Sequence, residues 1–103
     1  MNEADLHDLL DFAALGDAAS LAALYDEFAT DTYSVCAHYV DAGSDRDEAM
    51  TALWLHLWEQ APRLANTVAS VRTVVLVAAH AYANAFARER RAPELHRAHA
   101  LVA

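Results

Sequence analysis

Apolar side chains recur every three or four residues along almost the whole chain of 103 residues, and this spacing is the strongest constraint on its fold. Alternation of apolar and polar residues, the pattern of a half-buried strand, is missing. The chain has two glycines and two prolines, and they fall where helical segments are expected to stop. The sequence therefore predicts an all-α fold, a compact bundle of three to four helices.

The first two predicted helices meet at a glycine followed by an aspartate. The first helix is expected over Ala4–Leu15, and Gly16 provides its C-terminal stop. Asp17 can cap a second helix, whose apolar stripe runs over Leu21–Tyr39. Because Thr30–Thr32 is polar, it is a candidate break within this second helix.

The next two helices are separated by a loop that begins after a proline. Asp41–Asp45 is predicted to form a turn and then a cap for the third helix, which Pro62 is expected to close. A loop is expected over Arg63–Ala69. Ser70 then caps a last long helix, expected over Val71–Arg91.

The length of the chain is that of one domain, and a second proline follows the last helix. The prediction is a helical domain at residues 1–92 and a short C-terminal tail at residues 93–103. His96 and His99 have the i, i+3 spacing of two metal ligands, but Glu94 is their one neighbour of suitable chemistry. We therefore predict no metal and no other cofactor.

Charge is unevenly distributed over a chain whose net charge is −8. Residues 1–62 carry thirteen Asp or Glu and one Arg, a net −12, whereas residues 63–103 carry six Arg and two Glu, a net +4. This division suggests two partner surfaces of opposite sign. The simpler alternative is that the acidic faces are merely solvated.

Neither secretion nor catalysis is indicated. The N-terminal sequence MNEADLHDLLDF is acidic and lacks the basic and apolar regions of a leader. The longest strongly apolar run, Val74–Ala79, is too short to span a bilayer, so a cytoplasmic protein without membrane contact is expected. No motif of a nucleophile elbow, phosphate loop or carboxylate pair occurs, and Cys36 is predicted to be a core residue rather than a nucleophile.

The third helix holds both tryptophans of the chain, Trp54 and Trp58. The apolar residues at matching helical spacing are Met50, Leu53, Leu57 and Ala61. Both tryptophans are therefore predicted to lie in the core. A second stripe, on the other side of this helix, consists of Glu48, Thr51, Ala52, Leu55 and Glu59. On that side, Leu55 is either covered by a neighbouring helix or available to a partner.

Three stretches carry a resemblance to a known family. They are GDAASLAALYDEFATDTYSVCAHYV, DRDEAMTALWLHLWEQAPR and SVRTVVLVAAHAYANAFARERR. The chain from Leu15 to Arg91 resembles region 2 of bacterial RNA polymerase sigma factors of the extracytoplasmic-function group. The residues that match the pattern of this family are Gly16, Asp17, Leu24, Tyr25, Asp26, Phe28, Asp45, Ala49, Leu55, Trp58, Ala79 and Arg88. The resemblance implies a fold like that of sigma region 2.

The resemblance also implies a partner for the third helix. In such sigma factors this helix docks on the clamp helices of the β′ subunit of core RNA polymerase. The polymerase-binding residues it implies here are Glu48, Thr51, Ala52, Leu55 and Glu59. Thr51 and Ala52 stand where the family has Gln and Glu, so docking is expected to be weaker by about 1–3 kcal/mol. An anti-sigma factor is a further implied partner.

The second implied contact is with the unpaired minus-ten strand of a promoter, through the last helix and the loop before it. The DNA-binding residues it implies are Arg63, Asn66, Arg72, His80, Asn84, Arg88, Arg90 and Arg91. The family's Trp falls on Val74, its Arg-Asn pair on His80 and Ala81, and its Asp on Ala85. A net charge of −8 gives weak counterion release, so DNA binding is expected to be weak.

Three functional hypotheses follow. The first is a transcription initiation domain that binds polymerase and contacts promoter DNA, with no helix-turn-helix domain expected after Arg91. The second is a degenerate relative that keeps a protein-binding face and acts as a regulatory module without promoter recognition. The third is an unrelated helical protein or small enzyme.

Overall fold

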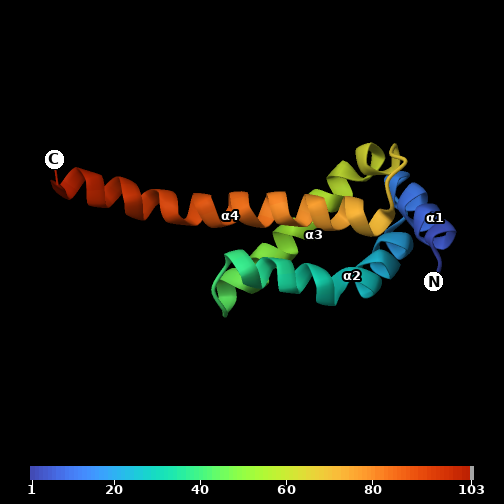
Figure 1. Ribbon diagram of the computed structural model, residues 1–103, viewed down its shortest axis with the longest axis horizontal. Helices are drawn as coiled ribbons and strands as arrows, with labels where there is room; N and C mark the ends of the chain where they lie inside the picture. The colour runs from blue at the N-terminus through green and yellow to red at the C-terminus, as the bar shows by residue number, and fades with distance from the viewer. Residues whose placement is uncertain (103) are drawn as a thin grey trace.

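The computed structural model describes the backbone of residues 1–102 and the side chains of residues 1–91. The elements are α1 (Glu3–Ala14), α2 (Ala18–Tyr39), α3 (Ser44–Ala65) and α4 (Val71–Val102). Both α1 and α4 pack against α2 and α3, with α1 at one end of the bundle (Figure 1). Residues 1–102 contain no strand, and the prediction of a compact all-α bundle is confirmed.

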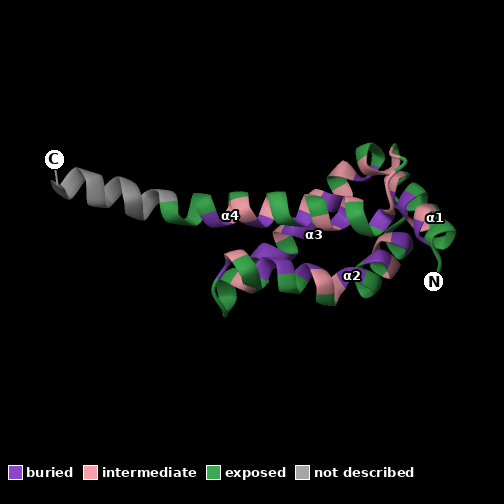
Figure 2. Cartoon of the chain, viewed as in Figure 1, coloured by how far each residue is buried: buried purple, intermediate pink, exposed green. Residues whose placement is uncertain are grey.

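One hydrophobic core joins the four helices, and its buried positions face inward on each of them (Figure 2). The core residues of α4 recur every fourth position and are small: Val71, Val75, Ala79, Ala83 and Ala87. Small side chains allow α4 to approach α2 and α3 closely. Cys36 is fully buried in this core, as the sequence predicts.

Capping contacts fix the predicted boundaries between the helices. Gly16, at φ +93°, follows α1, and the Asp17 carboxylate accepts from the backbone N–H of Ala19 and from the Ser20 hydroxyl. The Ser70 hydroxyl accepts from the backbone N–H of Thr73 and so caps α4. Both cap predictions, at positions 17 and 70, are therefore confirmed. The cap predicted for the third helix within Asp41–Asp45 is wrong, because the N-cap residue of α3 is Gly43 and no side chain caps this helix.

The predicted break at Thr30–Thr32 is wrong, because α2 runs through these residues without interruption. Thr32 is fully buried and its hydroxyl donates to the carbonyl oxygen of Phe28 at 2.7 Å. The same hydroxyl oxygen accepts from the indole Nε1–H of Trp54 at 3.2 Å. A polar residue is thus accommodated inside the helix, and such bonding to the preceding turn is a known cause of the bend that α2 shows in Figure 1.

Neither proline ends a helix, so two predicted boundaries are wrong. Pro62 lies inside α3, which continues to Ala65, and the loop before α4 is correspondingly shorter than predicted. The two residues after Arg63, Leu64 and Ala65, pack against the core, which favours the extra turn. The backbone of α4 also passes Pro93. In the sequence, strong helix formers surround Pro93 and favour continuation of the helix, whereas the proline itself removes one backbone hydrogen bond.

The two tryptophans differ in burial. Trp54 is 8% exposed and belongs to the core, whereas Trp58 is half-buried at the surface, so the prediction is right for the first and wrong for the second. Four residues advance a helix by slightly more than one turn, so Trp58 is rotated by about 40° from Trp54 around the axis of α3. That rotation places it nearer the side of Leu55.

Replacing Thr32 with valine is expected to destabilise the fold by about 1–3 kcal/mol, because the buried indole N–H of Trp54 loses its acceptor. Urea unfolding measures the change. Thr51→Val is the matched control, since the Thr51 hydroxyl also donates to the carbonyl four residues before it but is exposed. The control is expected to change stability by no more than about 0.5 kcal/mol. Equal effects of the two substitutions would contradict the role of the Trp54 bond.

Candidate functional site between α2 and α3

An apolar groove runs between α2 and α3 on the surface of the bundle, with a volume of about 330 Å³. Its lining residues are Leu21, Tyr25, Met50, Thr51, Trp54, Leu55 and Trp58. The rings of Tyr25 and Trp54 meet edge to face, with centroids 5.2 Å apart and planes at 70°. This geometry is favourable for an aromatic pair and gives the groove a fixed floor.

Leu55 is the most exposed large apolar side chain that α3 contributes, at 55%. It borders the groove on one side and, with Trp58 and Glu59, lines a second shallow hollow on the other. The sequence allows two environments for Leu55, burial under a neighbouring helix or availability to a partner. The exposure of its side chain excludes the first. An exposed leucine beside a half-buried tryptophan is suited to serve as an anchor for a partner.

The apolar surface continues along α2 beyond the groove. Tyr33 is 41% exposed and lines a hollow with Tyr25 and Met50. The guanidinium of Arg46 lies over the Tyr33 ring, 5.5 Å from its centroid. The side chain of Arg46 is held there by its Nε, which donates to the carbonyl oxygen of Val40 at 3.1 Å.

The five residues predicted to bind polymerase do not form one uniform surface. Thr51 and Leu55 line the groove, and Glu59 lies exposed beside Leu55. Ala52 is half-buried and does not line the groove. Glu48 forms an ion pair with Arg90 of α4, so its carboxylate is directed to the chain's own last helix.

Sequence reasoning missed the contribution of α2 to this surface, namely Leu21 and Tyr25. Both belong to the apolar stripe that the sequence predicts for α2, and a stripe alone does not say which of its members the bundle leaves uncovered. Tyr25 is 42% exposed, although its ring packs on Trp54.

Three of the residues predicted to bind DNA already have partners in the chain. Arg72 Nη1 lies 2.6 Å from a carboxylate oxygen of Asp31, and Arg90 pairs with Glu48. The guanidinium of Arg90 also lies over the ring of Phe86, 4.8 Å from its centroid. His80 Nδ1 is 3.0 Å from the hydroxyl of Tyr39.

The other five predicted DNA-binding residues lie on two elements and the loop that joins them. Arg63 is exposed in the last turn of α3, and Asn66 is its C-cap residue. On α4, Arg88 and Arg91 are exposed, whereas Asn84 is half-buried. The exposed arginines without an ion pair in the described part of the chain are thus Arg63 at the end of α3 and Arg88 and Arg91 on α4.

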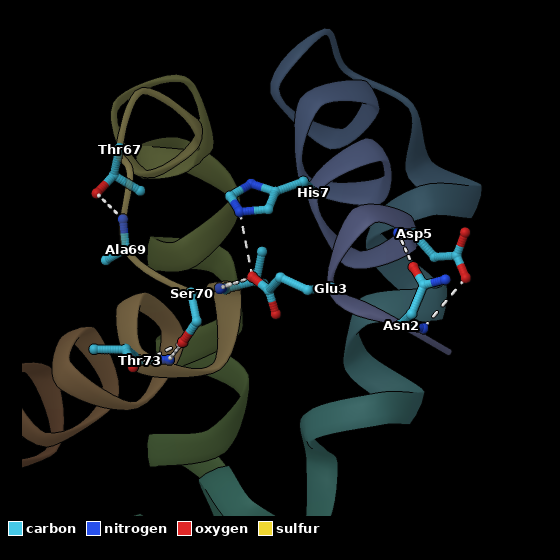
Figure 3. A network of polar contacts seen from close by, with 9 residues as sticks. Asn2, Glu3, Asp5, His7, Thr67, Ala69, Ser70 and Thr73 are labelled. Atoms are coloured by element: carbon cyan, nitrogen blue, oxygen red, sulfur yellow. Dashed lines mark hydrogen bonds and ion pairs between the residues drawn. The ribbon is translucent and has the colours of Figure 1, made fainter.

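The loop before α4 is held by the first helix of the chain (Figure 3). A carboxylate oxygen of Glu3 accepts from the backbone N–H of Val71 at 2.7 Å and lies 3.2 Å from His7 Nε2. This contact satisfies one of the unpaired N–H groups at the start of α4. Within the loop, the Thr67 hydroxyl accepts from the backbone N–H of Ala69.

The one thiol and the histidines show no reactive arrangement in the described part of the chain. Burial raises the pKa of the Cys36 thiol, and the charge of Arg46 opposes this in part, so the thiol is neutral near pH 7. Residues 1–91 contain no cluster of three or more His, Cys, Asp or Glu side chains able to hold a metal ion. His96 and His99 lie outside the side chains that the structure describes.

No helix within residues 1–102 has both the length and the apolar character needed to cross a membrane. Comparison with known proteins gave no match to a family model, to a curated protein or to a solved structure. The likeness to sigma factors therefore rests on the motifs in the sequence.

Proposed function

We propose that this chain is a divergent region 2 domain of a bacterial sigma factor, which acts in the cytoplasm by docking on the β′ clamp helices of core RNA polymerase. The observation that carries the proposal is the exposed Leu55 at the edge of the groove between α2 and α3. It lies on the helix for which the sequence motifs imply polymerase contact.

Apolar contact supplies the affinity in this proposal. The groove offers Tyr25, Trp58 and Leu55 as aromatic and aliphatic surfaces, and tyrosine and tryptophan often dominate the binding energy of an interface. Thr51, which stands in place of the family's Gln, lines the groove without adding a charge.

Exposed acidic residues on α2 and α3 supply orientation and encounter rate. Glu59 is exposed next to Leu55, and Asp26 and Asp47 are exposed elsewhere on the same two helices. A coiled coil that presents arginines or lysines would be attracted to these charges. Because exposed charges act mainly on the association rate, binding should slow as the salt concentration rises.

Contact with promoter DNA has less support than contact with polymerase. Arg63, Arg88 and Arg91 are exposed and are suited to contact the phosphates of an unpaired strand. Arg72 and Arg90 must first leave Asp31 and Glu48. Contact with the minus-ten strand is therefore expected within the polymerase complex rather than from the free chain.

Glu48→Ala is expected to strengthen binding of a single-stranded minus-ten oligonucleotide, because it releases Arg90 from its ion pair. The plot of log binding constant against log salt concentration should steepen by about 0.7, the value for one further phosphate contact on a single strand. Glu59→Ala is the matched control, since it removes the same charge from the same helix without releasing an arginine. Equal slopes for the two variants would contradict the prediction.

The alternative function is that of a degenerate sigma-like module, which keeps the protein-binding groove and has lost promoter recognition. The pairing of Arg72 and Arg90 with carboxylates favours it, as does Val74, which stands where the family has Trp. Photocrosslinking of the polymerase-bound chain to a minus-ten oligonucleotide separates the two functions. Sequence-dependent crosslinks to α4 support initiation, and salt-sensitive crosslinks without sequence preference support the degenerate module.

An anti-sigma factor would be expected to cover the groove between α2 and α3.

The experiment that tests the shared part of both functions is binding of the purified chain to a fragment of β′ that contains the clamp helices. Isothermal titration calorimetry is expected to show a complex of one chain per fragment at micromolar concentrations. Absence of binding at these concentrations would remove the support for both functions and leave an unrelated helical protein.

A further inference from the structure

The outer side of α1 is a second apolar surface, separate from the groove between α2 and α3. Met1 is 67% exposed, Phe12 53% and Leu15 84%. The opposite side of α1 is buried in the bundle through Leu6 and Leu10. Beyond its buried side, α1 and the residues at its ends thus have exposed apolar surface that the bundle does not cover.

A shallow groove of about 500 Å³ lies on this outer side. Its lining residues are Met1, Asp5, Asp8, Leu9 and Phe12. Single exposed apolar residues are common on protein surfaces and need no explanation. Here Met1, Leu9 and Phe12 share one hollow, which carboxylates border, whereas Leu15 does not line it.

Of the three aspartates on this side of α1, one stabilises the helix and two do not. The Asp5 carboxylate accepts from the backbone N–H of Asn2 and completes a capping box, so it has a structural role. Asp8 and Asp11 are exposed, and neither forms an ion pair within residues 1–91. Asp11 lies in the last turn of α1, where the helix dipole disfavours a negative charge.

We propose that the outer side of α1 binds a basic amphipathic helix of a partner protein. Apolar side chains of that helix would fill the hollow between Leu9 and Phe12, and its arginines or lysines would pair with Asp8 and Asp11. The twelve residues of α1 extend over about 18 Å, which matches about three turns of a partner helix. The net charge of −12 on residues 1–62 would favour the approach of such a helix.

The test uses a fluorescent synthetic helix with leucines at helical spacing and arginines on both flanks, titrated with the full chain and followed by anisotropy. Phe12→Ser and the double variant Asp8→Asn with Asp11→Asn are each expected to weaken binding by at least about tenfold, a change of about 1.4 kcal/mol. Val77→Ser, at an exposed apolar residue of α4 outside both grooves, is the control and should leave the affinity within about twofold. Phe12 and both aspartates are exposed, so thermal unfolding should stay unchanged.

A second peptide, with glutamate in place of each arginine, should bind at least about tenfold more weakly. The proposal is overturned if Leu55→Ser, in the groove between α2 and α3, abolishes binding while Phe12→Ser does not, if all variants lose affinity equally, or if neither peptide binds. Sedimentation of the chain alone checks a second copy as the occupant, and a dimer that Phe12→Ser dissociates would overturn the proposal in favour of self-association. None of these results depends on polymerase binding, which Leu55 variants test separately.

Discussion

Trp54→Ala is expected to destabilise the fold by about 3–5 kcal/mol, a large part of the stability of a domain of this size. Three contributions are lost together. The indole fills the core where α2 faces α3, its Nε1–H bonds the buried hydroxyl of Thr32, and its ring packs against the edge of Tyr25. Urea unfolding followed by circular dichroism measures the change.

Trp58→Ala is the matched control, because it removes the same side chain from the same helix one turn later. Trp58 is half-buried at the groove, so the expected loss is only about 1–2 kcal/mol. If Trp58→Ala destabilises the protein as much as Trp54→Ala does, the difference in burial between the two residues is contradicted.

Leu55→Arg is expected to weaken binding to the β′ clamp helices by at least about 2 kcal/mol, or roughly 30-fold in Kd. The change replaces the exposed apolar anchor with a cation, and it places that cation where a basic coiled coil is expected to approach. The melting temperature should remain nearly unchanged, because Leu55 is more than half exposed.

Val77→Arg is the control for Leu55→Arg. Val77 is 64% exposed on α4, outside the groove, so the same charge is added at similar exposure. Polymerase binding should change little in this control. Loss of stability in Leu55→Arg would show that the leucine is part of the core, and equal loss of binding in both variants would show that added charge alone is responsible.

The helices themselves were predictable from local signals. Two pairs of residues are chemical stop and start signals that act within one turn: Gly16 followed by Asp17, and Ser70 before Val71. The structure has helix boundaries at both places. Pro62 misled the prediction because a proline removes one hydrogen bond, whereas packing of the next residues on the core favours another turn.

The candidate site was predictable only in part, because the crossing of helices decides which residues stay uncovered. The predicted stripe of α3 included Leu55 and Thr51, which do line the groove. The ion pair between Glu48 and Arg90 joins residues 42 positions apart and depends on how α3 meets α4. By contrast, the place of Trp58 at the surface follows from a local property, the rotation of about 40° between residues four apart in a helix.

The most direct test of the central claim is to map a β′ clamp-helix fragment onto the isotopically labelled chain by amide chemical shifts. Docking at the groove predicts that the largest shifts cluster at Leu21, Tyr25, Thr51, Leu55 and Trp58, and that α1 and the exposed side of α4 change little. Shifts confined to α1 or α4, or no shifts at concentrations where the fragment is in excess, would contradict docking at the groove between α2 and α3.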